Sequence, residues 1–510
     1  MSKLTRASIL LAFFFGLDKA VAFLRLIITA RQFDLSTEYD AFNVANNIPD
    51  LLFMLISGGA LAMAFIPVLT ETLTKGGRER AWSLFSRIAN LAFVITAGLA
   101  LLVALLAGPL VRSRVGIAPG FGPEQQELVI ELMRLNLIAT LIFSISGLVM
   151  AGLQANQHFL LPAMAPLLYN VGQIFGATIL APETGYSVGP LTLPAFGLGI
   201  QGLVYGVILG ALLHLTIQIP GLARYGFRWS PSFAVQDPDV RKVLRLLGPR
   251  VVTMFFIQLT FLARDRFASF LETGSVSSLT LGWTIMQVPE TLIGTAIGIA
   301  ILPTLSELIA KEEREAYQAT LQRAFQVIVA LTLPIAVLLM IGLRPLLSAA
   351  FDFGPEGTEL LLWSTRGFLL GLTGQCLLEV AVRSFYARQD AITPLVTAGI
   401  NFLVYIVLCS VLVSPLGAPG ISLADSLAFT SQAVLLLVLL NRKLITRLAP
   451  AISLPRAALA AVIGGGVVIL VSMLPLSAGQ PLVMGLAALG LGGLVALLPI
   501  WKEIRMLLKL

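Results

Sequence analysis

The chain has 510 residues, of which 57% are hydrophobic and only 12% are charged, and its mean hydropathy is +0.91. Because a soluble domain has about 25% charged residues, this composition excludes an ordinary soluble protein and predicts many membrane-spanning helices. The net charge of +7 is attributed to membrane topology and not to nucleic-acid binding, because the cations cluster in alternate loops.

Apolar runs separated by short polar gaps predict an all-α integral membrane protein with about fourteen transmembrane helices. The expected spans are roughly 8–31, 42–70, 82–107, 125–150, 160–181, 198–220, 243–270, 276–306, 317–342, 357–385, 391–413, 420–440, 455–474 and 481–500. With the N-terminus in the cytoplasm, most lysines and arginines fall in inside loops, whereas Arg31, Arg112, Arg114 and Arg344 fall outside. This asymmetry predicts that both termini are cytoplasmic.

The first predicted helix carries three ionisable residues, Asp18, Lys19 and Arg25, in the middle or outer part of the bilayer. At 100° per residue, Asp18 and Arg25 lie within about 20° of each other on the helix, and Lys19 lies about 100° away. This spacing predicts one internal counter-ion and a surplus cation. The helix then forms a cationic cavity wall for an anionic substrate, or else a structural ion pair beside a lysine that reaches the interface.

A proline next to a carboxylate interrupts two apolar runs, at Pro49-Asp50 in the second helix and at Pro289-Glu290 in the eighth. Proline leaves a backbone carbonyl without its helical donor, so each break offers polar backbone to a cavity. Asp50 and Glu290 are therefore candidates for cation or proton coupling. Alternatively, each carboxylate stabilises the kink against a neighbouring helix.

Polar residues also gather at the entry to the second helix and in the seventh helix. Asn43 and Asn46 supply hydrogen-bonding groups that favour a wet environment. Arg264, Asp265 and Arg266 form the densest charge run in any predicted span, and they follow a long apolar run that places them near its outer end. They either form a local ion pair with side chains that reach the interface, or they bind a ligand.

Two sequence repeats, offset by 232 and 236 positions, divide the chain into halves. Phe121-Gly122-Pro123-Glu124 recurs as Phe353-Gly354-Pro355-Glu356, and the further pairs are Glu127/Glu359, Leu128/Leu360, Arg134/Arg366, Pro67/Pro303 and Glu71/Glu307. We expect residues 1–225 and 226–450 to form bundles of about six helices, related by a pseudo-two-fold axis along the membrane normal, with 451–510 as an extra helix pair. Because duplicated transporters hold substrate where their halves meet, the repeat predicts transport.

Motifs for chemistry are absent from the sequence. It contains no nucleotide-binding P-loop and no GxSxG nucleophile elbow, and His158 and His214 have no metal-ligand spacing. The two cysteines are far apart, which predicts neither a disulfide framework nor a zinc site. We therefore expect a protein that is not an enzyme and has no cofactor or metal, with energy from a coupling ion or the membrane potential. Gly294 and Gly298 have a GxxxG spacing, which predicts close helix packing.

Several segments closely resemble the signature of the MurJ (MviN) lipid II flippases, a family within the multidrug/oligosaccharidyl-lipid/polysaccharide exporter group. The segments that carry the resemblance are 39–52, 59–61, 64–68, 274–277, 301–306 and 385–390, the last followed by Thr393-Pro394. The predicted span count, the duplication and the terminal helix pair also fit that family. The resemblance therefore covers essentially the whole chain.

The resemblance implies two bundles in a V, whose central cavity takes a diphosphate-sugar head group, and a terminal helix pair that lines a groove for the polyprenyl tail. It implies that Lys19 and Arg25 are cavity cations and that Asp40 is an acidic cavity residue. It also implies a monomer in the bacterial cytoplasmic (inner) membrane, with membrane lipids around it and no nucleic-acid partner. The chain departs from the family at three usually basic positions, which are Phe53, Met54 and Thr284.

The leading hypothesis is a flippase that moves lipid II, an undecaprenyl-diphosphate-linked peptidoglycan precursor, from the cytoplasmic to the outer leaflet by alternating access. A flippase for another polyprenyl-linked glycan would suit the missing cavity cations. A cation-coupled drug exporter using Asp50 or Glu290 needs an acidic cavity, which the basic first helix disfavours. A non-transporting scaffold of cell-envelope assembly is the hypothesis from another class.

Overall fold

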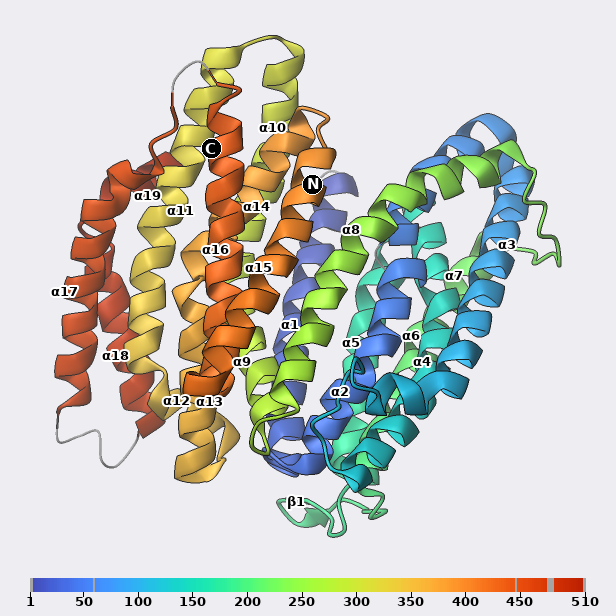
Figure 1. The fold of residues 1–510 in the computed structure, drawn as a ribbon. Coiled ribbons are helices and arrows are strands. Elements are labelled where there is room, and N and C mark those ends of the chain that lie inside the picture. Colours follow the sequence, from blue (N-terminus) through green and yellow to red (C-terminus); the bar gives the residue numbers. More distant parts are fainter. Residues whose placement is uncertain (1–2, 58–59, 445–446, 475–480, 508–510) are drawn as a thin grey trace. The chain divides into compact units, whose positions relative to one another are not determined.

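The computed structural model describes residues 3–57, 60–444, 447–474 and 481–507, and these residues are almost entirely helical (Figure 1). The described part also contains one antiparallel hairpin, in which β1 (Ser187–Val188) pairs with β2 (Leu191–Thr192). The chain forms two compact units, Met1–Phe270 and Leu271–Leu510. The predicted all-α membrane fold is therefore confirmed.

The described residues of the first unit form eight α-helices and two π-helical turns, besides the hairpin. They are α1 (Lys3–Phe33), α2 (Thr37–Leu52), η1 (Phe53–Ser57), α3 (Ala60–Arg112), α4 (Pro123–Ala155), α5 (Leu160–Phe175), η2 (Gly176–Leu180), α6 (Gly199–Thr216), α7 (Ile219–Arg224) and α8 (Pro238–Ala268). Its core gathers large side chains of α3 and α4, among them Phe65, Phe85 and Leu148.

Within the part of the second unit that the structure describes, there are eleven α-helices, a π-helical turn and a short 3-10 helix. They are α9 (Ser275–Glu290), η3 (Thr291–Thr295), α10 (Ala296–Ala310), α11 (Arg314–Gly342), α12 (Arg344–Phe351), α13 (Gly354–Leu370), α14 (Leu372–Ala387), α15 (Ile392–Leu416), α16 (Ala418–Asn441), η4 (Pro450–Ser453), α17 (Leu454–Ser472), α18 (Pro481–Ala496) and α19 (Trp501–Leu507). The predicted close packing at the GxxxG spacing is present. A Cβ on Gly294 would lie 2.8 Å from Cys376 Cα, and one on Gly298 would lie 2.9 Å from Arg383 Cδ.

Nine helices of the described residues are long and apolar enough to cross a membrane, or up to eleven if each bent helix pair is one span. The predicted count of about fourteen is thus not confirmed. The segment α3 consists of two helices that meet at a kink at Gly77, where φ is 76°, and its two arms carry parts of the predicted spans 42–70 and 82–107. The helix α2 has only 16 residues, fewer than the roughly 20 that cross the hydrocarbon core.

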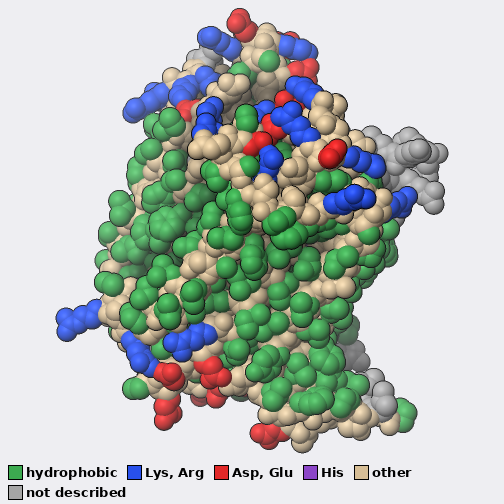
Figure 2. Space-filling model, turned by 90° about the vertical axis from the view of Figure 1, so that its right-hand side faces the viewer, with side chains coloured by type: hydrophobic (Ala, Val, Ile, Leu, Met, Phe, Trp, Pro, Cys, Tyr) green, Lys and Arg blue, Asp and Glu red, His purple; other side chains and the backbone are tan. Residues whose placement is uncertain are grey.

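The surface of the molecule matches a membrane environment. On the face drawn in Figure 2, hydrophobic side chains cover the broad middle, and lysine, arginine, aspartate and glutamate gather at the two ends. Large apolar residues of α3 lie exposed, such as Leu101 at 62% and Leu105 at 69%. Burying these side chains in lipid removes them from water, so the chain is a multi-pass membrane protein.

The structure repeats the interactions that the sequence repeat predicts. Arg112 forms an ion pair with Glu127, and their counterparts Arg344 and Glu359 form the same pair in the second unit. Another such pair of residues is Arg134 and Arg366, which donate through Nε to the carbonyls of Ala104 (3.0 Å) and Met340 (2.8 Å). The two halves are therefore copies in their contacts as well as in their sequence.

The boundary between the compact units differs from the predicted boundary at residue 225. The helix α8, which the repeat assigns to the second half, packs in the first unit. Two ion pairs hold it against α3, Arg80–Asp239 at 2.8 Å and Arg87–Asp237 at 2.6 Å. A sequence repeat records ancestry, whereas these side-chain contacts decide which bundle a linking helix joins.

Both predicted proline breaks lead into π-helical turns. The helix α2, with Pro49-Asp50 near its end, is followed by η1, and α9, which ends at Pro289-Glu290, is followed by η3. Proline removes a backbone donor, and the chain accommodates the loss by widening the helix for one turn. The break in the first unit lies beside the cavity described next.

Candidate functional site

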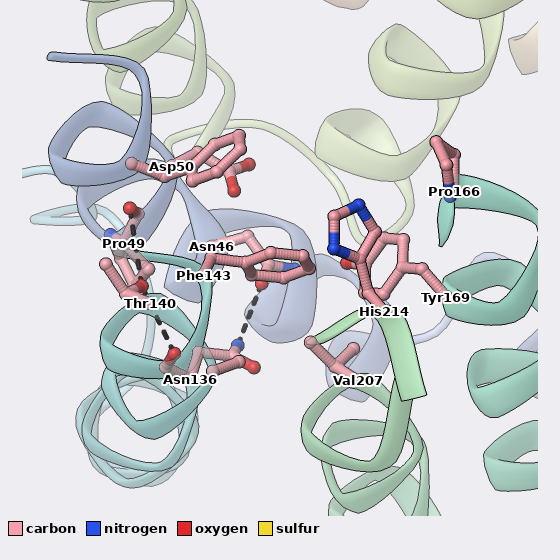
Figure 3. A pocket seen from close by; sticks show the side chains of 12 residues that line it. Asn46, Pro49, Asp50, Asn136, Thr140, Phe143, Pro166, Tyr169, Val207 and His214 are labelled. Carbon is pink, nitrogen blue, oxygen red and sulfur yellow. Dashed lines mark hydrogen bonds between the residues drawn. The ribbon is translucent and has the colours of Figure 1, made fainter. Parts of the chain in front are cut away.

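A cavity of about 260 Å³ lies inside the first unit, between α2, η1, α4, α5 and α6 (Figure 3). Its lining residues are Asn46, Pro49, Asp50, Phe53, Asn136, Ala139, Thr140, Phe143, Pro166, Tyr169, Val207 and His214. In Figure 3 Asn136 and Thr140 lie on one side and Tyr169 and His214 on the other, and the ring of Phe143 reaches from α4 toward them. One wall is thus rich in amide and hydroxyl groups, and the other is aromatic.

The aromatic wall centres on Phe143. Its ring centroid lies 5.2 Å from Phe53, 5.1 Å from Tyr169 and 5.3 Å from His214. The last two contacts are edge-to-face, the geometry that the ring quadrupole favours. These contacts join η1, α4, α5 and α6 into a rigid apolar surface.

Close packing of α5 on α6 places two of these aromatic residues. A Cβ on Gly172 would lie 2.4 Å from Gly210 Cα, and one on Gly210 would lie 2.6 Å from the carbonyl oxygen of Tyr169. Only glycine permits the two backbones to approach this closely. The glycines therefore determine how near Tyr169 on α5 comes to His214 on α6.

The polar wall is a short hydrogen-bond chain between α2 and α4. Asn136 donates through Nδ2 to Asn46 Oδ1 at 2.8 Å, and Asn46 donates to the carbonyl of Phe42 at 3.0 Å. Thr140 Oγ1 lies 3.5 Å from the carbonyl oxygen of Pro49, beside the proline break. Among the described residues, Asn136 Oδ1 has no hydrogen-bond partner although the atom is buried.

His214 is held on the far side of the cavity by two polar neighbours. Its Nδ1 lies 2.6 Å from Ser146 Oγ and 3.3 Å from Gln218 Nε2, and the residue is 7% exposed. Within the described part of the chain, no group of three or more His, Cys, Asp and Glu side chains could hold a metal ion. The histidine therefore serves the cavity as an aromatic and polar wall residue.

Two ionisable residues, Asp50 and Arg25, determine the charge at the cavity. Arg25 on α1 is close enough to Asp50 and Tyr169 for its charge to act on both groups. Among residues 3–57, 60–444, 447–474 and 481–507, no carboxylate lies within ion-pair distance of Arg25. Asp50 is exposed at the cavity, and the described residues offer it neither an ion pair nor a hydrogen bond.

The predicted ion pair between Asp18 and Arg25 does not form. Asp18 instead accepts a hydrogen bond from Asn170 Nδ2 at 2.9 Å, which ties α1 to α5. Helical spacing puts Asp18 and Arg25 near one face of the helix, but it could not reveal the asparagine on a neighbouring helix. Lys19 is exposed on α1.

The predicted substrate-binding residues on α2 separate into two groups. Asn46 lines the cavity, whereas Asp40 is 1% exposed and lies outside the lining. Asn43 donates through Nδ2 to the carbonyl of Tyr39 at 2.9 Å, within its own helix. Met54 is 40% exposed and lies outside the lining, while Phe53 forms part of it.

The predicted charge run on α8 forms a local, buried network. Arg264 Nε lies 2.7 Å from Asp265 Oδ1, and the two side chains are 9% and 0% exposed. Asp265 Oδ2 also accepts a hydrogen bond from Asn47, at 2.6 Å. Arg266 donates to the carbonyl of Gly116 at 3.1 Å. Of the two sequence interpretations, the local ion pair is the one present.

Glu290 belongs to the second unit and is 5% exposed. It accepts hydrogen bonds from Thr295 Oγ1 at 3.1 Å and from Thr291 Oγ1 at 3.4 Å. The neighbouring residues Glu379 and Arg383 form an ion pair along α14. Glu290 is thus hydrogen-bonded beside its π-helical turn, as a kink-stabilising carboxylate would be.

Sequence reasoning missed Asn136, Tyr169 and His214. Each is a single polar or half-polar residue in an apolar helix, and none forms a motif with its sequence neighbours. A usable signal is present nonetheless, because Asn136 and Thr140 are four residues apart and share a helix face.

The helical bundles, the π-helical breaks and the polar cavity within apolar helices define a membrane transporter. Solved transporters share the fold. The structure called lipid II flippase MurJ in an inward closed conformation aligns with a TM-score of 0.81 and 20% identity, covering 98% of this chain and 100% of that one. An inward-facing multidrug resistance MATE family transporter of the MOP superfamily aligns with a TM-score of 0.65 and 14% identity, covering 83% and 93%.

The family follows from the sequence comparison. The family model described as lipid II flippase MurJ matches residues 29–486, so the chain belongs to that family. The lipid II flippase MurJ of Burkholderia cenocepacia is 28% identical over 450 residues, which cover 86% of this chain and 84% of that protein. The resemblance that the signature segments indicate is therefore confirmed.

Proposed function

We propose that this chain flips lipid II, the polyprenyl-diphosphate-linked peptidoglycan precursor, from the cytoplasmic to the outer leaflet by alternating access. Membership of the MurJ family supports this function, as do relatives that are themselves named lipid II flippases. In this proposal the head group crosses in a polar cavity while the lipid tail stays in the bilayer. The protein transports its substrate unchanged.

The observation that carries the proposal is Arg25, whose charge acts on the cavity residues Asp50 and Tyr169 and which has no carboxylate partner among the described residues. A cation within a membrane helix costs a few kcal/mol unless a partner or water compensates it. A diphosphate would supply that partner, because guanidinium and phosphate oxygens form strong charge-assisted hydrogen bonds. Lys19, exposed on the same helix, would attract the same anion on its way in.

An apolar groove in the second unit supports a lipid substrate. It has a volume of about 480 Å³, and its lining comes from α11 and α17. The lining residues are Leu333, Val337, Ile341, Ala458, Ala461, Val462, Gly465, Gly466 and Ile469. Aliphatic side chains and glycines suit a polyprenyl chain, which offers only hydrocarbon to bind.

The proposal includes a driving force that needs no cofactor. An interior-negative membrane potential contributes about 2.3 kcal/mol per charge per 100 mV, which favours export of an anionic head group. Asp50 and Glu290 are the carboxylates at which a cation or proton would couple instead. The proposal also places a monomer in the bacterial inner membrane with both termini in the cytoplasm.

The test uses the full-length protein purified and reconstituted into liposomes of bacterial phospholipid. Labelled lipid II is compared with another polyprenyl-diphosphate-linked sugar by a leaflet-accessibility assay, with and without an imposed potential. We expect lipid II to change leaflet faster than in liposomes without protein, and faster than the second lipid. Equal rates with and without protein contradict the proposal. Preference for the second lipid favours the alternative function, a flippase for another polyprenyl-linked glycan. Phe53 in the cavity lining, at a position that is usually basic in the family, fits that alternative.

A further inference from the structure

Three polar groups without hydrogen-bond partners converge on the cavity of the first unit. Asn136 Oδ1 is buried, on a side chain that is 2% exposed, and no described residue donates a hydrogen bond to it. The Tyr169 hydroxyl and the Asp50 carboxylate also line the cavity, and the described residues form no hydrogen bond with either. A buried polar atom in a folded protein is almost always paired, so Asn136 Oδ1, with the half-buried Tyr169 and the exposed Asp50 on the same cavity, points to a ligand that donates a hydrogen bond there.

The charges at the cavity define the kind of ligand. Arg25 carries a positive charge that acts on the Asp50 carboxyl. This charge disfavours a bare cation in the cavity, and the carboxyl oxygens of Asp50 can accept hydrogen bonds. The site instead suits a neutral group with hydrogen-bond donors and acceptors, attached to an anionic group near Arg25.

The size and the walls of the cavity narrow the choice further. A volume of about 260 Å³ is below the roughly 300–1,000 Å³ of sites for drug-sized ligands, so it accommodates one small ring. Phe53, Phe143 and Tyr169 contribute aromatic rings to the lining, and Asn46 and Asn136 contribute amides. A sugar ring has this same division, with apolar C–H faces and polar hydroxyl and acetamido edges.

We propose that this cavity is a saccharide subsite that takes the N-acetylated hexose attached to the diphosphate, while Arg25 holds the phosphate. The inference rests on the proposed flippase function and deepens it. Asn136 Oδ1 and Asp50 accept hydrogen bonds from the sugar, and the Tyr169 hydroxyl donates one. These three residues determine specificity for a glycosylated lipid over the bare polyprenyl diphosphate.

The experiment measures binding to the purified full-length protein in detergent by calorimetry, apart from any transport. The probes are a short-chain polyprenyl diphosphate and the same lipid carrying one N-acetylglucosamine. We expect wild type to bind the glycosylated probe at least about tenfold more tightly. Tyr169→Phe and Asn136→Leu reduce this preference to less than about threefold, and they leave the Kd for the bare diphosphate unchanged.

Control variants distinguish a saccharide subsite from a general loss of lipid binding or of folding. Tyr205→Phe removes a hydroxyl from an exposed residue of α6 outside the cavity and keeps the preference. Arg25→Ala weakens both probes alike, because both carry the diphosphate. Thermal unfolding checks that each variant is folded, and Tyr169→Phe, which removes a single oxygen, preserves the test if Asn136→Leu unfolds.

Three outcomes overturn the subsite. In the first, wild type binds both probes equally, and in the second, the cavity variants weaken both probes alike. In the third, the preference appears only with sodium and is lost when choline replaces it, which makes the cavity a cation site. Failure of the flippase proposal is seen separately, as binding without movement of lipid II in liposomes.

Discussion

Asn47 on α2 donates a hydrogen bond to Asp265 on α8, with 2.6 Å between Nδ2 and Oδ2. The contact joins residues that are 218 positions apart, and Asp265 is fully buried. Because Asp265 also pairs with Arg264, one carboxylate holds both an amide and a guanidinium inside the first unit. The contact fastens the first helix of the second repeat to the bundle of the first.

Loss of this carboxylate is expected to destabilise the protein strongly. Asp265→Asn leaves the Arg264 guanidinium buried beside a neutral group, at a cost of about 3–5 kcal/mol. Asn47→Ala removes only a hydrogen bond to a charged acceptor and costs about 1.5–3 kcal/mol. Thermal unfolding in detergent should rank wild type above Asn47→Ala, and Asn47→Ala above Asp265→Asn. Adding Arg264→Met to Asp265→Asn should recover part of the loss, and no recovery would show that the ion pair is unimportant.

Gly210→Ala is expected to damage the cavity through the packing of α5 on α6. The added Cβ would lie 2.6 Å from the Tyr169 carbonyl oxygen, and such overpacking costs about 1–3 kcal/mol. We expect a lower melting temperature and a weaker preference for glycosylated lipid. Gly98→Ala on α3 is the matched control, because its Cβ meets no atom within 4 Å. Equal behaviour of the two variants would mean that the contact does not position Tyr169.

Arg25→Ala is expected to reduce lipid II movement in liposomes by about tenfold or more. Hydrogen bonds to a charged group contribute about 1.5–3 kcal/mol, and 1.4 kcal/mol corresponds to a factor of ten. Arg25→Lys keeps the charge but loses the forked geometry, so we expect an intermediate rate. Arg314→Ala, at an exposed position at the start of α11, should match wild type. Normal rescue of a flippase-depleted strain by Arg25→Ala would remove this residue from the substrate site.

The Asp390–Lys443 pair is expected to add stability that acid removes. The two residues lie outside the spanning helices, and Lys443 Nζ lies 2.7 Å from Asp390 Oδ2. Burial raises the pKa of Asp390, but hydrogen bonds from Lys443 and Thr393 outweigh it and lower the pKa to about 2. The unfolded-state pKa is about 3.9, so the contribution is complete above that pH and disappears as the pH falls toward 2.

Thermal unfolding of wild type and Asp390→Asn between pH 6 and pH 2.5 measures this effect. The difference in melting temperature should be constant near neutral pH and should shrink below about pH 4. In a protein that carries Lys443→Met, adding Asp390→Asn should change the melting temperature at neutral pH much less than it does in wild type. The reason is that Lys443 supplies the charge that stabilises the carboxylate. A difference that stays constant down to pH 2.5 would exclude Asp390 as its source.

Much of the fold could be predicted from the sequence. A chain that spans a lipid bilayer needs long apolar helices, and the internal repeat is visible as identical residues at a constant offset. The pairs Arg112–Glu127 and Arg344–Glu359 show how directly the repeat carries over into contacts. The span count stays a prediction, because hydropathy marks apolar stretches and does not show where the chain kinks, as α3 does at Gly77. The place of α8 depends on ion pairs between distant segments, which no local pattern reports.

Part of the site was also predictable. Ionisable or polar residues in apolar helices singled out Arg25, Asn46 and Asp50, all of which lie at or beside the cavity. Asp40 drew attention by the same rule but lies buried outside the lining. The aromatic wall could not be predicted from the sequence. Tyr169 looks like any other residue of an apolar helix, and its place in the wall depends on how α6 packs against α5.

The second unit has a different side chain at the position that corresponds to the cavity residue Asn136. Its residue equivalent to Asn136 is Phe368, a fully buried phenylalanine whose ring meets Trp283 edge-to-face at 5.5 Å. A ring packed against Trp283 therefore stands in the second unit where the first has the amide of Asn136 in a cavity wall. Duplication thus retained the helices of the bundle while the side chains that point into it diverged.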